Sequence, residues 1–117
     1  MVRWFVVAAL SLVAGTVFAQ GLSFSLVNET DQPIKALYVS PNDLNMWGPD
    51  ILGNVIQIGQ ARQVRLQQTP TVCISDLMAV FADGTSKAVW QNFNLCQVTE
   101  MRLRYDRFSG IATAQYN

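Results

Sequence analysis

Residues 72–106 read VCISDLMAVFADGTSKAVWQNFNLCQVTEMRLRYD, and this stretch decides the fold class. It opens with a nearly continuous apolar run, residues 72–82, which is typical of a central strand with apolar neighbours on both faces. Asp83-Gly84 follows, a strong hairpin signal because both central residues of a type I′ turn need a positive φ. Residues 86–93 then return as the second strand of the hairpin.

The cysteines fit this predicted hairpin. If Asp83-Gly84 forms the turn, Cys73 lies opposite Asn94, two residues from Cys96. A bulge or a strand end that shifts the register would bring the cysteines within reach. The chain has two cysteines, and pairing is the default in an oxidising compartment. We therefore predict a Cys73–Cys96 disulfide. A redox or nucleophilic role is disfavoured because the sequence has no histidine and no C-x-x-C motif.

Alternating patterns predict further short strands outside the hairpin. The clearest is residues 99–106, in which charged side chains at even positions alternate with mainly apolar ones at odd positions. Other strands are expected at residues 22–27, 34–39, 54–58, 62–67 and 111–116. About seven strands at this spacing predict an all-β fold, a single antiparallel β-sandwich. A small β-barrel is the alternative, because periodicity does not separate the two.

The N-terminus has the composition of a secretory signal peptide, residues 1–19. Arg3 supplies a positive n-region, residues 5–18 are apolar, and Val17-Phe18-Ala19 offers a cleavage site. The apolar run is shorter than the ~20 residues of a membrane-spanning helix. We expect a cleaved leader followed by a β-sandwich domain at residues 20–117. The protein should then be periplasmic or secreted, with no membrane span after cleavage.

The charge balance and the lack of histidine exclude several function classes. Lys and Arg number 8, Asp and Glu number 8, and no histidine is present. A neutral chain lacks the basic excess that nucleic-acid binding needs. Without histidine, neither a Ser-His-Asp nor a Cys-His unit nor a histidine-ligated metal site can form. We predict that the protein is not an enzyme and needs no cofactor.

The most unusual segment is residues 40–53, SPNDLNMWGPDILG. Loops of this length are uncommon in compact domains and are often functional. Trp47 would serve as an aromatic anchor, with Asp43 and Asp50 setting the polarity of a binding site. Tyr38, on the preceding predicted strand, completes the candidate binding residues.

Other interpretations of the same loop stay open. One is that its apolar side chains fold back and cap one end of the sandwich, namely those of Leu44, Trp47, Ile51 and Leu52. Asp43, Asn45 and Asp50 could offer oxygen ligands to calcium, but their spacing matches no defined calcium loop, so no metal site is predicted. A third is a weak hydrolase that uses Asp43 and Asp50.

Charged residues inside the predicted strands are expected to face solvent. Asp76 interrupts the apolar run 72–82, and if buried it would need hydrogen-bonding partners. Arg102 and Arg104 share a face, but Glu100 and Asp106 lie on it too. We therefore expect a solvated face of mixed charge rather than an anion-binding stripe.

With these residues placed, the sequence resembles a group of small exported bacterial proteins. The similarity runs from about Phe24 to Tyr105, and its most specific parts are the Tyr-Val-Ser-Pro and Trp-Gly pieces. The pieces that carry it are Asn28-Glu29-Thr30 with Ile34, Leu37-Tyr38-Val39-Ser40-Pro41, Trp47-Gly48-Pro49-Asp50-Ile51-Leu52-Gly53, Asp76-Leu77, Phe81-Ala82-Asp83-Gly84 and Asn94-Leu95-Cys96. The resemblance implies an exported small β domain and no catalytic residue.

The sequence thus predicts an exported, non-enzymatic binding protein for a protein or small ligand. It would act through the 40–53 loop or through an exposed sheet edge. The alternative is an inhibitor of an extracellular or periplasmic enzyme, working as a rigid plug.

Overall fold

The structure, a computed structural model, describes residues 23–66 and 73–117; the predicted leader, residues 1–19, lies outside this part. The described chain is all-β, and it has no helix that could span a membrane. Seven strands form: β1 (Ser23–Asn28), β2 (Ile34–Pro41), β3 (Ala61–Arg65), β4 (Ile74–Phe81), β5 (Lys87–Asn94), β6 (Glu100–Asp106) and β7 (Ile111–Tyr116). The strand expected at residues 54–58 does not form. Only Ile56 makes an isolated bridge there, to Ile34.

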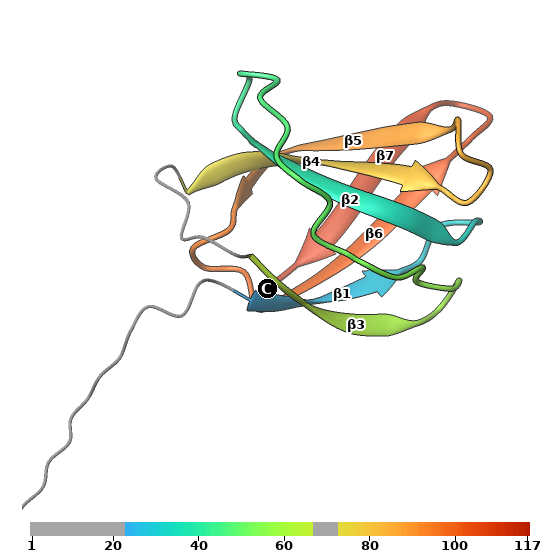
Figure 1. Cartoon of the computed structure of the whole chain (residues 1–117), viewed down its shortest axis with the longest axis horizontal. Helices are drawn as coiled ribbons and strands as arrows, with labels where there is room; N and C mark the ends of the chain where they lie inside the picture. The colour runs from blue at the N-terminus through green and yellow to red at the C-terminus, as the bar shows by residue number, and fades with distance from the viewer. Residues whose placement is uncertain (1–22, 67–72) are drawn as a thin grey trace, which may run out of the picture.

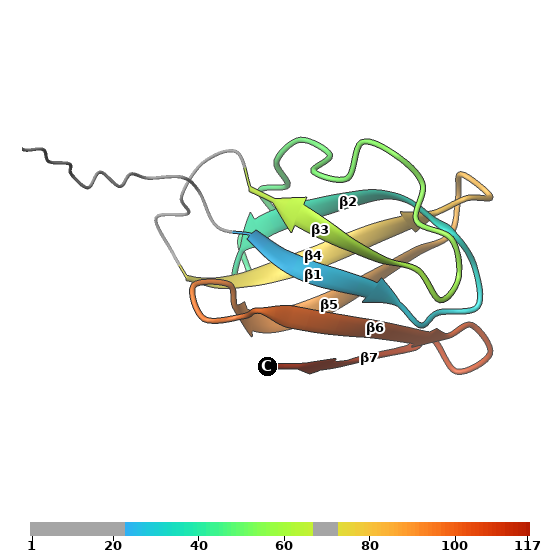
Figure 2. The same cartoon turned by 90° about the horizontal axis from the view of Figure 1, so that it is seen from below.

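The strands make two packed sheets that do not close into a barrel (Figure 1). One has the order β3-β1-β6-β7, seen from below in Figure 2, and the other has the order β2-β4-β5. The expectation of a purely antiparallel sandwich is wrong, because β1 runs parallel to β6. After Asn28 the chain crosses to the other sheet, so the neighbours of β1 come from distant parts of the sequence. No hairpin joins β1 to β6, so nothing forces these two strands to run antiparallel.

The core lies between the sheets and follows from the alternation of each strand. In β6, Met101 and Leu103 are fully buried while Arg102 and Arg104 are exposed, as the sequence predicts. Aromatic side chains join the two sheets. Phe81 of β4 stacks on Tyr105 of β6 with ring centroids 5.5 Å apart. Each fully buried large side chain contributes about 1.5–3 kcal/mol to folding.

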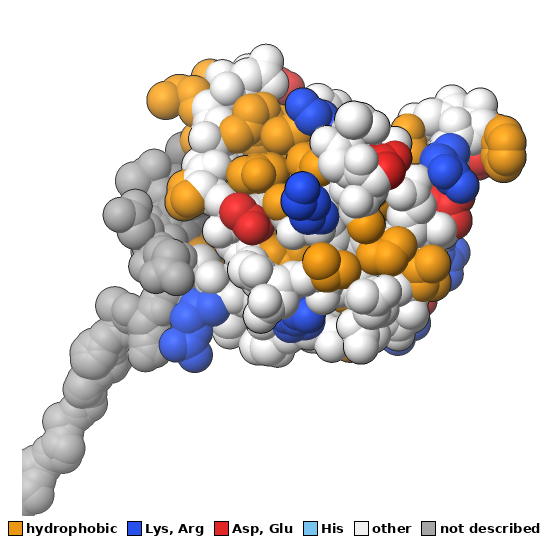
Figure 3. All heavy atoms as spheres, turned by 45° about the vertical axis from the view of Figure 1, so that its right-hand side comes forward, with side chains coloured by type: hydrophobic (Ala, Val, Ile, Leu, Met, Phe, Trp, Pro, Cys, Tyr) orange, Lys and Arg blue, Asp and Glu red, His pale blue; other side chains and the backbone are white. Residues whose placement is uncertain are grey.

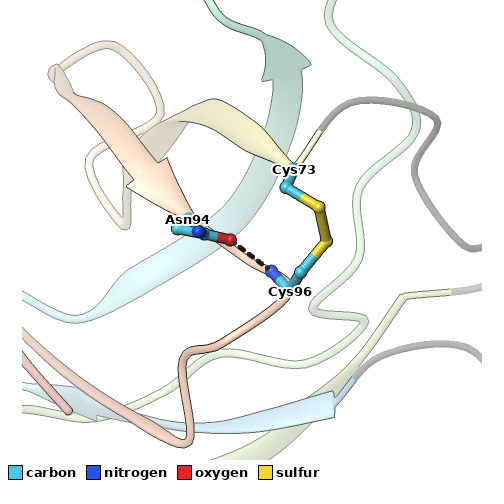
Figure 4. The surroundings of a disulfide bond; sticks show 3 residues. All are labelled: Cys73, Asn94 and Cys96. Carbon is cyan, nitrogen blue, oxygen red and sulfur yellow. Dashed lines mark hydrogen bonds between the residues drawn. A yellow bond between two sulfur atoms is a disulfide. The ribbon is translucent and has the colours of Figure 1, made fainter.

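The β4–β5 hairpin has the predicted register near its turn and a shift at its open end. Val80 pairs with Lys87 and Leu77 with Trp90, but Ile74 then pairs with Asn94. This bulge, between Ser75 and Leu77, is one of the two register changes expected from the cysteine spacing. Cys73 and Cys96 form a disulfide with their Cα atoms 5.3 Å apart. The Cys96 amide donates to Asn94 Oδ1 at 3.1 Å (Figure 4).

The hairpin turn is wider than a two-residue type I′ turn. Gly84 has φ +82°, but Asp83 does not share its left-handed conformation. Phe81 and Ser86 close the turn through the Phe81 amide, which donates to the Ser86 carbonyl at 3.0 Å. The reason is that the Asp83 carboxylate accepts hydrogen bonds from the amides of Thr85 and Ser86 and from the Ser86 hydroxyl.

The hydrogen bonds that the Asp83 carboxylate accepts predict a contribution to stability that is lost in acid. The hydrogen bond from the Ser86 hydroxyl and those from the Ser86 and Thr85 amides lower the pKa of Asp83 from 3.8 to about 2. A pKa lowered by folding means that the group stabilises the protein above pH ~4 and loses this effect between pH ~4 and ~2. We expect the Asp83 carboxyl to titrate near pH 2 by NMR. In Ser86→Ala it should titrate closer to 3.8, and an unchanged midpoint would contradict the assignment.

Candidate binding surface

The second half of the 40–53 loop is structural. The Ile51 amide donates to the Leu37 carbonyl at 2.9 Å. Asp50 Oδ1 accepts from the amides of Leu37, at 3.0 Å, and Leu52, at 2.9 Å. Leu52 is buried in the core. This half therefore covers the outer edge of β2. The carboxylate of Asp50, a predicted site residue, accepts backbone hydrogen bonds at that edge.

The first half, residues 42–47, forms a fixed turn that rises above the β2-β4-β5 sheet (Figure 1). The Asp43 amide donates to Asp76 Oδ2 at 3.0 Å, and the Met46 amide donates to Ser40 Oγ at 2.8 Å. The Asn42 amide reaches the Ile74 carbonyl at 3.1 Å. We call residues 42–47 the 42–47 turn. Its backbone is fastened to both β2 and β4.

Asp76 organises this turn from beneath. Its residue is 4% exposed, so the expectation that it faces open solvent is wrong. The outward side of β4 is covered there by the turn, and the carboxylate has partners. Oδ2 accepts from Asp43 and Oδ1 from the Asn92 amide at 3.1 Å. Asp43 and Asn92 both have left-handed backbones, with φ 62° and 67°. One buried carboxylate thus holds the turn and the β5 bulge.

The 42–47 turn presents apolar side chains to the outside. Leu44 is 57% and Met46 66% exposed, and Trp47 is half-buried. Ile51 packs against the core. The alternative prediction, that the loop folds back onto the sandwich, therefore holds for the second half of the loop and not for Leu44. Figure 3 shows hydrophobic side chains gathered at the upper left of this side of the molecule, where the chain leaves β2.

A row of apolar side chains lies on the outer face of the β2-β4-β5 sheet, two positions along β2 and β4 from Ser40 and Asp76, which hold the turn. Tyr38 pairs with Met78, and Met78 pairs with Val89 across the three strands. Their neighbours Leu77 and Ala88 point into the core, so the row points outward. Tyr38 and Met78 are half-buried and Val89 is 41% exposed. We call Tyr38, Met78 and Val89 the apolar row.

The outer face of the other sheet is charged instead. Glu29 bridges Arg102 at 3.0 Å and Arg104 at 2.8 Å, and Arg102 also meets Glu100 at 3.2 Å. The hydrogen bond from Arg104 lowers the pKa of Glu29, and the hydrogen bond to Glu100 raises the pKa of Arg102. The predicted mixed-charge face is confirmed. The outer face of this sheet therefore carries a network of ion pairs, whereas the other outer face carries the apolar row, with Lys87 exposed two positions from Val89.

The predicted site residues divide among the turn, the apolar row and the covered edge of β2. Trp47 lies beside the end of β2, where the next residue, Gly48, donates its amide to the Val39 carbonyl at 3.0 Å. Tyr38 belongs to the apolar row, Asp43 to the turn and Asp50 to the covered edge. Within residues 23–66 and 73–117, no group of three or more His, Cys, Asp or Glu residues could hold a metal ion.

Sequence reasoning missed Met78 and Val89 as surface residues. The apolar run 72–82 instead predicts a central strand that is packed, at least partly, on both faces, and this is wrong for the outer face of the sheet at Met78 and Val89. One face fills the core. The other is the surface of the domain, at least among the residues that the structure describes.

Comparison with known proteins places the fold alone. No protein-family model matches the chain, and no curated protein matches its sequence. A solved structure, the NMR structure of a protein from Eubacterium rectale, is similar at a TM-score of 0.54 with 14% sequence identity. The similarity covers 81% of this chain and 86% of that chain.

Proposed function

We propose that the protein is an exported, non-enzymatic binding protein that docks a partner protein on the 42–47 turn and the apolar row. One observation carries this proposal. Leu44 and Met46 are exposed on a turn whose backbone is held by hydrogen bonds to Asp76 and Ser40. A contiguous exposed apolar surface on a folded domain is typical of an interaction site.

The rigidity of the turn favours binding. A segment that is already ordered loses little conformational entropy when it docks, so more of the contact energy appears as affinity. Asp43 and Asn45 hold left-handed backbones, with φ 62° and 50°. Non-glycine residues adopt this conformation at a cost, and such positions concentrate at functional sites.

The shape of the surface favours a protein over a small molecule. Sites for small ligands are concave and enclose most of the ligand. The 42–47 turn projects outward instead, and the side chains of Leu44 and Met46 are more than half exposed. A projecting apolar element fits a hollow on a macromolecular partner. The Cys73–Cys96 disulfide is compatible with an oxidising compartment outside the cytoplasm.

A matched pair of variants tests the proposal. Leu44→Ser/Met46→Ser removes the apolar side chains of the turn. Val55→Ser/Ile58→Ser removes two exposed apolar side chains from the same connection between β2 and β3, away from the turn. We expect affinity capture from periplasmic extract with mass spectrometry to recover a partner with the wild type and the second variant, at least tenfold depleted with the first. Equal recovery by both variants would contradict the proposal.

An inhibitor of an extracellular or periplasmic enzyme is the second candidate. The rigid backbone of the turn favours it, because a plug must enter an active site without being remodelled. Adding the wild-type protein to the captured partner should then suppress the activity of that partner. Leu44→Ser/Met46→Ser should leave the activity intact. A partner with no activity to suppress would support a binding role alone.

Trp47 gives an optical readout of the same surface. Trp90 is 3% exposed, whereas Trp47 is half-buried, so acrylamide should quench mainly Trp47 in the protein without its leader. We expect Trp47→Phe to abolish most of the quenchable emission and captured partner to protect it. Emission that quenches equally well after Trp47→Phe would show that Trp47 is shielded.

A further inference from the structure

We infer that β7 is a self-association edge, along which two copies of this chain pair their β7 strands antiparallel and join two sheets into one. Sheet edges carry free backbone amides and carbonyls, and proteins normally protect them with charges, proline, bulges or covering segments. In the described chain the other three edges show such protection and β7 does not.

The other three edge strands, β2, β3 and β5, each have a feature that hinders pairing with another strand. The outer edge of β2 is covered by residues 48–56 through Gly48, Ile51 and Ile56. β3 is five residues long and contains two arginines. β5 begins with Lys87 and has a left-handed residue, Asn92, near its end.

β7 has the opposite character. Its sequence, IATAQY, has no charged residue, no proline and no glycine. It pairs with β6 over six consecutive residues without a shift in register. Ile111 and Tyr116 at its two ends are 58% and 51% exposed. A regular, uncharged strand of this kind is a template for another strand.

The ladder shows which backbone groups are free. Hydrogen-bonded and non-hydrogen-bonded pairs alternate along an antiparallel pair. The Asn117 amide donates to the Glu100 carbonyl at 3.1 Å, so the odd-numbered residues of β7 bond to β6. The amides and carbonyls of Ala112, Ala114 and Tyr116 therefore point to the outer edge.

A two-fold axis at Ala114 would satisfy all of these groups at once. Ala114 would face Ala114 of the second copy, and Ala112 would face Tyr116 in both directions. The Tyr116 ring packs edge-on against Phe93 of its own copy, with ring centroids 5.1 Å apart, and the small Ala112 of the second copy would leave room for it. On the outer face, Thr113 would lie opposite Gln115 of the second copy. No charged pair is opposed in this register, so β7 is complementary to itself, which is why a second copy is the occupant.

Two double variants test this register. In Thr113→Glu/Gln115→Glu, Arg104 and Arg102 lie directly beside the new acids within the same copy, so the monomer keeps its fold. Across the axis, however, Glu would oppose Glu twice. In Thr113→Glu/Gln115→Lys, Glu would oppose Lys across the axis. Within one copy the new Lys lies beside Arg102, whose charge is balanced by Glu29 and Glu100. Like charges directly opposite destabilise a strand pair and opposite charges stabilise it.

The experiment is sedimentation velocity over a concentration series, with amide exchange at Ala112, Ala114 and Tyr116. We expect the wild type and the Glu/Lys variant to dimerise with rising concentration, with slowed exchange at these three amides. The Glu/Glu variant should stay monomeric, with circular dichroism like that of the wild type. A wild type that stays monomeric at millimolar concentration would overturn the inference, as would a Glu/Glu variant that dimerises equally. A partner of another sequence protecting these amides would overturn it too.

Discussion

Replacing Asp76 by alanine is expected to lower the free energy of unfolding by about 2–4 kcal/mol. The substitution leaves the amides of Asp43 and Asn92 without their acceptor, at positions with left-handed backbones. Both hydrogen bonds are partly buried and end on a carboxylate, and a hydrogen bond to a charged group contributes about 1.5–3 kcal/mol. A loss of this size is a large share of the roughly 5–15 kcal/mol that stabilises a typical domain. Urea denaturation followed by tryptophan fluorescence measures it.

Asp31→Ala is the matched control for this substitution. This substitution also removes a charged hydrogen bond, the one between Asp31 and Arg107 at 3.0 Å, but both side chains are about half exposed. Exposed ion pairs contribute about 0–1 kcal/mol. We expect the Asp31 variant to unfold near the wild-type midpoint. Equal effects from the two alanine variants would mean that Asp76 has no organising role.

Removing the disulfide is expected to lower the free energy of unfolding by about 3 kcal/mol. Cys73 and Cys96 are separated by 23 positions in the sequence, and the cross-link restricts the unfolded chain over that whole loop. The double variant Cys73→Ser/Cys96→Ser should unfold at a clearly lower urea concentration than the oxidised wild type. The disulfide also closes the hairpin end next to the bulge at Asn92.

Reduction of the wild type provides the control. The reduced protein should unfold with the midpoint of the double serine variant, and reductant should leave that variant unchanged. A reduced wild type as stable as the oxidised protein would contradict the prediction. So would free thiols in protein isolated from its native location.

Strand positions were predictable because they depend on local alternation. In β6 each residue already shows by its chemistry whether it points into the core. The hairpin register was predictable for the same reason, since pairing outward from Asp83-Gly84 gives the observed match of Val80 with Lys87. The parallel pairing of β1 with β6 was not, because it joins segments far apart in the sequence and no local pattern encodes it.

The candidate site was half predictable. The length of the 40–53 loop and the presence of Trp47 identified the segment. Its division into a covered edge and a projecting turn depends on where single hydrogen bonds fall, above all those of Asp50 and Asp76. Alternation alone assigns Asp76 to the outward side of β4 correctly. It does not reveal that the 42–47 turn folds over that side and buries the carboxylate.

The most direct test is amide hydrogen exchange in the 42–47 turn of the free protein. If the turn is organised in advance for binding, the amides of Asp43 and Met46 exchange far more slowly than those of an unstructured loop, and Asp76→Ala releases that of Asp43. Exchange at unstructured rates in the wild type would mean that no fixed apolar turn exists for a partner to bind.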